Sequence, residues 1–375
     1  MKQKIIFTSN LKDKLFNIVT KLKPSKILFV TANKSFIKLN IKTLIEPITN
    51  KYMSKRFFGF DNNPKLTDVN KGIKVLKGFQ PDIIISIGGG SVMDMGKLIN
   101  ILSQNPMYKD LIRNNSNFKI SKIPLIAIPT TSGTGSESTS FSVIYINNKK
   151  YSVSDMSMLP DYALIDISLS STMSKKLRAS SAFDAFSQSI ESYWSINSTK
   201  ASQILSIKAI KLIHTNLIKS LNNDKSARTA MAKAANLSGQ AINITKTTAP
   251  HALSYRISTK YGLQHGHAVA LTLGKFFILN YPEHDMNISD RRGYKFVMST
   301  MKSLFNALGV KSPEEASDYW YNLMKKTGLE PNINIACSLT KSDLLGIIRG
   351  VDPFRLKNNP IKVTDKDMLG VFWDK

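Results

Sequence analysis

The feature that most constrains the fold is a change of pattern near residue 170. Before it, short apolar runs that begin at Lys26, Asp82 and Pro124 are separated by segments of helical period. Such runs are typical of strands buried on both faces of a parallel sheet. After it, apolar residues recur at helical spacing over 171–198, 202–221, 227–244, 268–280, 292–308 and 313–326. The pattern therefore predicts an α/β domain, Rossmann-like in its alternation, over 1–170, and an all-α domain over 171–375.

Length and composition agree with a two-domain globular protein. A chain of 375 residues exceeds what one core usually serves, and 42% apolar with 21% charged residues is ordinary for a folded protein. The single cysteine, Cys337, has no internal disulfide partner, which fits a reducing compartment. No apolar run reaches the length of a signal-peptide core or a membrane span. We expect a cytoplasmic protein without a membrane association.

The charge is strongly positive but evenly spread. There are 52 basic and 26 acidic residues, which gives a net charge of +26, and the lysines stand in ones and twos along the chain. A dense basic block of the kind that binds nucleic acid is absent, so we expect no nucleic-acid partner. The positive electrostatic field of such a protein favours a small anionic substrate or cofactor. A non-catalytic basic binding protein is the distant alternative.

A triple glycine follows the buried run at 83–87. Gly88, Gly89 and Gly90 precede Ser91 and a helical segment with Asp94 in its first turn. Glycine lets the backbone approach a phosphate, and the free N–H groups at the start of a helix bind anions. The spacing differs from the dinucleotide fingerprint G-x-G-x-x-G. The glycines therefore indicate a phosphate site, and a tight strand-to-helix turn is the structural alternative.

A hydroxyl-rich loop follows the apolar run at 124–129. Its threonines Thr130, Thr131 and Thr134 stand among Ser132, Ser136 and two glycines. Such a loop offers donors for the pyrophosphate and the nicotinamide ribose of a dinucleotide. A solvated connection is the alternative.

Three of the five histidines lie within seventeen residues, at His251, His265 and His267, and Asp184 lies on a helical segment upstream. Neutral imidazole is the commonest metal ligand, so this clustering indicates a metal site. Histidines that only pack in a core are the alternative.

Taken together, these motifs resemble the iron-containing alcohol dehydrogenases over nearly the whole chain. The resemblance rests on Gly88–Ser91 with Asp94 and Lys97, on the loop from Pro129 to Glu137, on Asp184 to Glu191, and on His251 with His265. It implies NAD or NADP bound by Gly88, Gly89, Gly90, Ser91, Asp94, Thr130, Thr131 and Thr134. It also implies a divalent metal, Fe or Zn, held by Asp184, His251 and His265.

The fourth metal position of the family, a histidine, is Gln188 in this chain. Residues 184 and 188 project from the same face of a helix, so residue 188 is placed to reach the metal. The amide oxygen of Gln188 is a weaker ligand for iron or zinc than imidazole. Three alternatives stay open: ligation through that oxygen, an open coordination position, or a site that has lost its metal.

The resemblance implies hydride transfer from the nicotinamide to an aldehyde, with the metal as Lewis acid on the carbonyl oxygen. His265 takes part as a metal ligand, and His267 is the candidate for proton relay or substrate binding, with a structural or exposed histidine as the alternative. Within the family, the segments around Glu191, His251 and His265 and the segment from Leu356 to Pro360 are most similar to members that reduce phosphonoacetaldehyde to 2-hydroxyethylphosphonate. A neutral short-chain aldehyde such as lactaldehyde or butyraldehyde is the alternative substrate.

A phosphonate group needs cations and donors near the metal, for which Lys246, Thr247 and Thr248 are the candidates and Arg256 and Arg355 the weaker ones. Surface charge is the alternative for each. For the cofactor, the segment from Val30 to Ser35 lacks the acidic residue that binds a ribose 2′-hydroxyl. Ala32 leaves room there, and Lys34 with Ser35 offers donors for a 2′-phosphate, so NADP is favoured slightly over NAD. The oligomeric state is left open, with a homodimer as one possibility.

Overall fold

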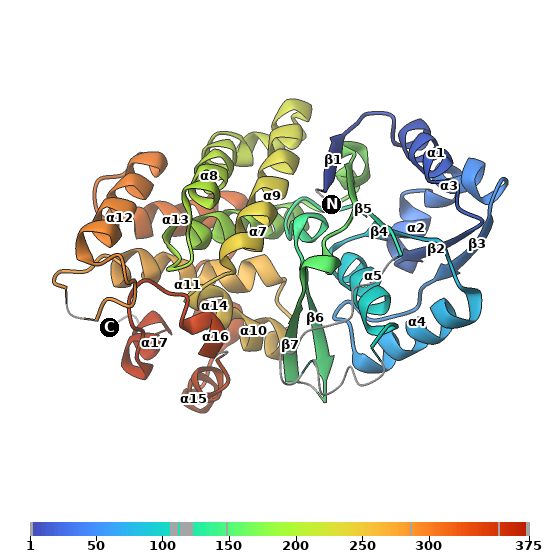
Figure 1. Ribbon diagram of the computed structural model, residues 1–375. Helices are drawn as coiled ribbons and strands as arrows, with labels where there is room; N and C mark the ends of the chain where they lie inside the picture. The colour runs from blue at the N-terminus through green and yellow to red at the C-terminus, as the bar shows by residue number, and fades with distance from the viewer. Residues whose placement is uncertain are drawn as a thin grey trace. The chain divides into compact units, whose positions relative to one another are not determined.

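The computed structural model describes residues 3–105, 112, 123–147, 149–285, 287–351 and 353–372 (Figure 1). The chain divides into two units, Met1–Met173 and Ser174–Lys375. The boundary lies three residues after the one that the change of pattern predicts. The predicted fold class is confirmed, because the first unit is built on a parallel sheet and the second on helices.

Six parallel strands form the sheet of the first unit, in the order β1-β8-β5-β4-β2-β3. The predicted apolar runs are three of its four inner strands, β2, β4 and β5. Because all six strands are parallel, their carboxyl ends lie at one edge, where α/β proteins bind ligands. The strands are β1 (Lys4–Phe7), β2 (Lys26–Thr31), β3 (Met53–Phe57), β4 (Ile83–Gly88), β5 (Leu125–Pro129) and β8 (Tyr162–Ile165).

Helices cover both faces of this sheet, so successive residues of a strand enter different cores. Leu28 and Val30 of β2 pack with α4 and α5, whereas Ile27 and Phe29 pack with α1 and α3. Burial on both faces is the reason why the central strands read as continuous apolar runs. The helices of this unit are α1 (Leu11–Leu22), α2 (Asn33–Lys38), α3 (Ile41–Thr49), α4 (Leu66–Phe79) and α5 (Gly90–Leu102), with short 3-10 turns at η1 (Ser136–Ser138), η2 (Met156–Met158) and η3 (Ile167–Ser170).

An antiparallel hairpin of β6 (Phe141–Ile146) and β7 (Lys149–Ser154) is a feature that the alternating strand and helix pattern does not predict. Residues of β6 alternate between half-buried and buried positions, the period-two pattern of a strand with one covered face. The buried side chains Ile144 and Ile146 join the same core as α4 and α5.

The second unit is helical throughout its described residues. It contains α7 (Lys175–Trp194), α8 (Lys200–Leu221), α9 (Lys225–Thr245), α10 (Ala249–Tyr261), α11 (His265–Leu279), α12 (Tyr294–Leu308), α13 (Pro313–Thr327), α14 (Ile333–Cys337), α15 (Lys341–Arg349), α16 (Pro353–Leu356) and α17 (Asp365–Phe372). Most predicted segments are confirmed to within a few residues. The segment 171–198 is too long, because Ser174 caps α7 by accepting from the amide of Leu177. Helix α10 falls outside the predicted segments, since Pro250 breaks the pattern; at the first turn of a helix, proline is tolerated.

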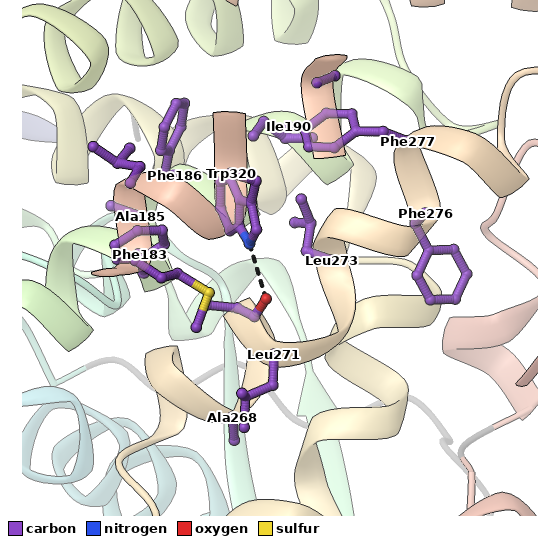
Figure 2. Packing of buried hydrophobic residues seen from close by; sticks show 14 of the residues in the cluster. Phe183, Ala185, Phe186, Ile190, Ala268, Leu271, Leu273, Phe276, Phe277 and Trp320 are labelled. Carbon is purple, nitrogen blue, oxygen red and sulfur yellow. Dashed lines mark hydrogen bonds between the residues drawn. The ribbon is translucent and has the colours of Figure 1, made fainter. Parts of the chain in front are cut away.

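Trp320 of α13 fixes the centre of the helical core (Figure 2). Its indole N–H donates to the carbonyl of Ala270 at 2.8 Å, which satisfies the one polar atom of a fully buried ring. Phe183 meets the ring edge to face, at 4.9 Å between centroids and 89° between planes. Helices α7, α11 and α13 are thereby held together, and α7 and α11 carry Asp184 and His265.

Candidate metal centre and cofactor turn

Helix α7 carries three buried polar side chains on one face: Asp184, Gln188 and Glu191 are 3%, 4% and 0% exposed. Residues four and seven positions apart lie above one another on a helix. Burying two carboxylates is costly unless partners surround them, so this face marks a built site rather than ordinary core.

Histidines from two other helices meet Asp184. Its Oδ1 lies 3.4 Å from Nε2 of His251 on α10 and 3.9 Å from Nε2 of His265, the first residue of α11. The three ligand atoms lie within 4.8 Å of one another. One carboxylate and two imidazoles suit Fe or Zn, so the residues fit the implied metal. The His265 side chain is 38% exposed, whereas those of Asp184 and His251 are each 4% exposed, so the site is reached from the His265 side.

The close approach of α11 to α7 depends on Gly266. A Cβ atom at this position would lie 1.9 Å from the carbonyl oxygen of Ser180 and 2.8 Å from the backbone nitrogen of Asp184. Any larger residue therefore forces the helices apart. Gly266 is what brings His265 within reach of Asp184.

Glu191 stands behind His251 and was not singled out as a site residue from the sequence. Its Oε2 accepts from Nδ1 of His251 in a short hydrogen bond, and its Oε1 accepts from the amides of Thr248 and His251 and from the Thr248 hydroxyl. Trp194 donates in turn to that hydroxyl at 3.0 Å. A carboxylate in this position fixes the histidine tautomer and leaves Nε2 free for a metal. Since Thr248 gives α10 no side-chain cap, Glu191 also caps this helix from α7.

The electrostatics of the cluster favour the charged forms of both His251 and Asp184. Burial lowers the pKa of His251, but the charge of Glu191 and the hydrogen bonds to Asp184 and Glu191 outweigh burial and raise this pKa to about 9. Burial raises the pKa of Asp184, but the hydrogen bond with His251 and the charges of His265 and His251 outweigh it, and the net shift is downward. The charges in this array thus compensate one another.

Gln188 faces the same cluster. Its Nε2 donates to Oδ1 of Asp184 at 3.2 Å, and its Oε1 accepts from the Ser238 hydroxyl at 2.7 Å. The hydroxyl of Ser238 both donates and accepts, so a half-turn of the amide places the oxygen on the Asp184 side and keeps a partner for the nitrogen. The surroundings of Gln188 therefore fit ligation through its oxygen.

His267 lies two residues after His265, in the first turn of α11, but has other partners. Its Nε2 hydrogen-bonds to the carbonyl of Glu330 at 2.7 Å, and its amide donates to Ser180. Burial lowers the pKa of the ring, and Nδ1 is buried without a partner in the described residues. This geometry favours the structural alternative over a proton relay, which needs a nitrogen that exchanges protons.

The residues expected to bind the substrate are divided by the structure. Thr248 uses its hydroxyl for Glu191 and Trp194, and Arg256 donates to the carbonyl of Gly346 at 2.6 Å, which joins α10 to α15. Thr247 accepts from the buried Arg355 at 2.9 Å, one residue from the Glu191 network. Thr247 and Arg355 therefore lie nearer to the Glu191 network than Arg256 does.

Lys246 stands at the end of α9 in an unusual backbone conformation. With φ of 61° and ψ of −177° it occupies a region that is essentially restricted to glycine. Backbone strain of this kind persists where the surroundings impose it, as in functional segments.

In the first unit, the glycine turn and the hydroxyl loop come together. The amide of Thr130 donates to the Gly88 carbonyl at 2.9 Å. A Cβ at Gly90 would lie 2.9 Å from the Thr134 methyl group, whereas one at Gly89 would meet Thr131 only at 3.6 Å. Helix α5 begins at Gly90 with no side-chain cap, which leaves its first amides available to an anion. The glycine turn and the hydroxyl loop therefore form one surface.

The side chain of Lys97, on α5, is buried under this surface and is 1% exposed. Its ammonium group donates to the carbonyl of Ser136 at 2.5 Å and of Phe141 at 3.1 Å, and to the hydroxyls of Ser136 and Thr139 at 3.0 and 2.9 Å. Burial lowers its pKa from 10.5 to about 8, although the charges of Asp94 and Glu137 oppose this shift. Lys97 thus ties α5 to the loop that faces the glycine turn.

Asp94 completes the same junction. Its oxygens accept from the Ser136 hydroxyl at 2.7 Å and from the amide of Val143 at 3.0 Å. Burial raises the pKa of this carboxyl, against the charge of Lys97. The expected contact of Asp94 with a ribose competes with these two internal bonds. Ala32 and Lys34 lie after β2, half-buried and exposed respectively.

Across the described residues, no helix combines the length and the apolarity that crossing a membrane requires.

Comparison with known proteins identifies the family. The model described as "Iron-containing alcohol dehydrogenase" matches residues 2–167, and the one described as "Fe-containing alcohol dehydrogenase family, C-terminal" matches residues 178–373. The chain belongs to the iron-containing alcohol dehydrogenase family.

Relatives within this family differ in substrate. Aldehyde-alcohol dehydrogenase 2 of Entamoeba histolytica is 30% identical over 82% of this chain, which spans 38% of that protein's length. The NADPH-dependent butanol dehydrogenase of Clostridium saccharobutylicum is 34% identical over 57% of each chain. The phosphonoacetaldehyde reductase of Streptomyces viridochromogenes is 30% identical over 68% of this chain and 67% of its own.

A solved structure confirms the fold over the whole chain. Sulfoacetaldehyde reductase from Bifidobacterium kashiwanohense, in complex with NAD+, superposes with a TM-score of 0.87 at 24% identity and covers 99% of this chain and 96% of its own.

Gly266→Ala tests the role of the helix approach. The added methyl group meets a backbone oxygen at 1.9 Å, so we expect a loss of about 1–3 kcal/mol in the free energy of unfolding. We also expect at least about a tenfold loss of Zn²⁺ affinity, because His265 moves with α11. Urea denaturation and competition with a chromophoric chelator measure the two. Gly370→Ala in α17, where a Cβ meets nothing within 4 Å, is the control; equal behaviour of the two variants contradicts the interpretation.

Glu191→Gln tests the support of His251. The change keeps the shape of the side chain but removes the acceptor charge on Nδ1, so Zn²⁺ affinity should fall by about 10- to 100-fold. Chelator competition at pH 7.5 is the measurement. Asp290→Asn, another buried carboxylate in this unit that is bonded to Arg292, should leave the affinity unchanged. An unchanged affinity in the Glu191 variant excludes the orienting role.

Lys97→Met tests the buried lysine through pH. Between pH 8 and 10.5 the unfolded chain still binds the proton that folded Lys97 has released, so wild-type stability rises with pH in this window. Relative to the variant, the wild type should gain up to about 3 kcal/mol across it. Urea denaturation at pH 7.5 and 10 measures this, with exposed Lys77→Met as control. A wild-type advantage that is independent of pH contradicts the assignment.

Proposed function

We propose that this protein is a metal-dependent alcohol dehydrogenase, working as an aldehyde reductase with a nicotinamide nucleotide. The observation that carries the proposal is the convergence of Asp184, His251 and His265, from three helices, within 4.8 Å. Histidines that only pack in a core do not require buried carboxylates at both nitrogens of one ring, where Glu191 and Asp184 lie in the case of His251. Membership of the iron-containing family supports the same chemistry.

The metal ligands in this proposal are Asp184, His251 and His265, with the amide oxygen of Gln188 as the fourth donor. When bound there, a divalent cation supplies Lewis acidity for the aldehyde oxygen, and the nicotinamide supplies the hydride. Glu191 holds His251 in the tautomer that presents Nε2. The half-exposed His265 leaves an approach for the substrate.

The cofactor site in this proposal is the surface of the first unit formed by the glycine turn and the hydroxyl loop. The amides at the start of α5 bind the pyrophosphate, and the hydroxyls of Thr130, Thr131 and Thr134 contact the phosphates and the ribose. Lys97 and Asp94 keep that surface rigid, so less order has to be gained when the cofactor binds.

For the substrate we propose phosphonoacetaldehyde, reduced with NAD(P)H and one proton to 2-hydroxyethylphosphonate and NAD(P)+. The reductase from Streptomyces viridochromogenes, 30% identical over 68% of this chain, supports this choice. The net charge of +26 favours an anionic substrate. Within the second unit, the buried Arg355 supplies a cationic group on Thr247, and Lys246 lies two residues before Thr248 of the Glu191 network.

A neutral short-chain aldehyde is the second candidate. It is favoured by the butanol dehydrogenase of Clostridium saccharobutylicum, which is 34% identical to this chain over a shorter span. In that case Lys246 and Arg355 serve structure alone. For the cofactor, NADP is preferred in the proposal because the turn after β2 offers Ala32 and Lys34 and no carboxylate.

A panel of aldehydes with the purified full chain tests the proposal. We expect NADPH-dependent turnover that is lost on chelation and restored by Fe²⁺ or Zn²⁺. We expect kcat/KM for phosphonoacetaldehyde to exceed that for propanal by at least about tenfold, the worth of one charge-assisted hydrogen bond.

The outcomes separate the levels of the proposal. Equal turnover of propanal and phosphonoacetaldehyde excludes a specificity for the phosphonate and leaves the proposal of an aldehyde reductase in place. Full activity in the chelated protein, with no metal detected by mass spectrometry, excludes the metal-dependent mechanism.

A further inference from the structure

The order of the strands places the two halves of a bound dinucleotide in the first unit. The glycine turn follows β4, whose neighbours are β5 on one side and β2 on the other, with β3 beyond β2. The hydroxyl loop at 130–137, proposed for the nicotinamide half, follows β5. With the pyrophosphate on the glycine turn, the adenosine half therefore lies over the carboxyl ends of β2 and β3.

The carboxyl end of β2 has no acidic residue. Thr31 ends the strand, and Ala32 and Asn33 follow it. In dinucleotide-binding folds a carboxylate at this point bonds the ribose 2′-hydroxyl and repels a 2′-phosphate, whereas a nearby arginine accepts the phosphate. The end of β2 thus lacks the group that selects NAD.

Arg56 of β3 reaches across to this same point. Its Nε donates to the Thr31 hydroxyl at 2.6 Å, and its Nη2 donates to the side-chain oxygen of Asn33 at 2.7 Å. Position 56 pairs with Phe29 in the parallel register, two residues before Thr31, so the long side chain runs along the sheet toward the carboxyl edge.

Two aromatic rings hold the guanidinium in place. Its Cζ lies 3.7 Å from the centroid of the Phe36 ring and 4.2 Å from that of Phe58. Phe58 remains 46% exposed, so this arrangement is at the surface and open to a ligand. Stacking fixes the plane of the guanidinium, which lowers the entropy lost when it binds an anion.

The fixed guanidinium keeps donors and charge available. Only neutral oxygens accept from it in the described residues, and its Nη1 has no partner among them. A charge fully neutralised by a carboxylate would be a structural ion pair. Here the positive charge faces the place where the adenosine ribose lies.

We propose that Arg56 binds the 2′-phosphate of NADP(H) and sets the preference of this enzyme for NADP(H) over NAD(H). This inference rests on the proposed nicotinamide-dependent function. Arginine is suited to the task because its planar fork makes paired hydrogen bonds to phosphate oxygens. Exposed Lys34, on α2 two residues after Ala32, adds a second positive charge on the same side of the turn.

Binding of cofactor fragments tests the proposal without metal or aldehyde. Adenosine 2′,5′-bisphosphate and 5′-AMP differ only in the 2′-phosphate, and calorimetry with the full chain measures both. We expect the wild type to bind the bisphosphate about 10- to 100-fold more tightly than 5′-AMP. In Arg56→Gln, which keeps a donor and a flat group between the rings, this ratio should fall to within about threefold, with 5′-AMP affinity unchanged.

A matched control removes the same charge from the same strand. Lys55→Ala changes an exposed residue that projects to the opposite face, so its ratio should equal that of the wild type. A wild type that binds both fragments equally, or an Arg56→Gln variant that keeps the wild-type ratio, overturns the proposal. If phosphonoacetaldehyde is not reduced but the ratio is lost in Arg56→Gln, the proposed substrate fails and the inference stands.

Discussion

The burial of two carboxylates on one helix is the constraint around which the second unit is arranged. Asp184 and Glu191 lie two turns apart on α7, and each is almost fully buried. An uncompensated buried charge costs several kcal/mol, so both must find partners in the folded chain. The ring of His251 lies between them and satisfies both, which places α10 against α7.

That requirement reaches into the neighbouring helices. Glu191 takes the first amides of α10 as well as the His251 ring, so the start of this helix is fixed by a side chain of another. On the other side, Asp184 draws in His265, and α11 comes close enough only because residue 266 has no side chain. The hydrophobic core around Trp320, drawn in Figure 2, then packs α7 and α11 together.

In the first unit a buried cation has the corresponding role. Among the described residues no carboxylate contacts the ammonium group of Lys97, and four neutral oxygens of Ser136, Thr139 and Phe141 accept from it. If the loop moved away, the ammonium group of Lys97 would stay buried and would lose its hydrogen-bond acceptors. The loop is thereby held against the glycine turn.

Much of this arrangement follows from the sequence, because it depends on local pattern. The apolar runs at Lys26, Asp82 and Pro124 predict the central strands, and the spacing of Asp184 and Gln188 places both on one helix face. Glu191, Lys97 and Arg56 show the limit. Lys97 and Glu191 stand in motifs that carry the resemblance and Arg56 in none, and no local pattern shows what the three side chains contact, because their partners are between 23 and 60 positions away along the chain.

The sequence by itself determined the two kinds of unit, the positions of the glycine turn and hydroxyl loop, and the residue types offered to a metal, since period and spacing act within a few turns of chain. Only the tertiary structure decided which side chains meet. In it, His267 hydrogen-bonds to the Glu330 carbonyl, Arg256 hydrogen-bonds to α15, and Arg56 hydrogen-bonds to the end of β2. Burial and hydrogen bonding depend on neighbours that only the fold brings together.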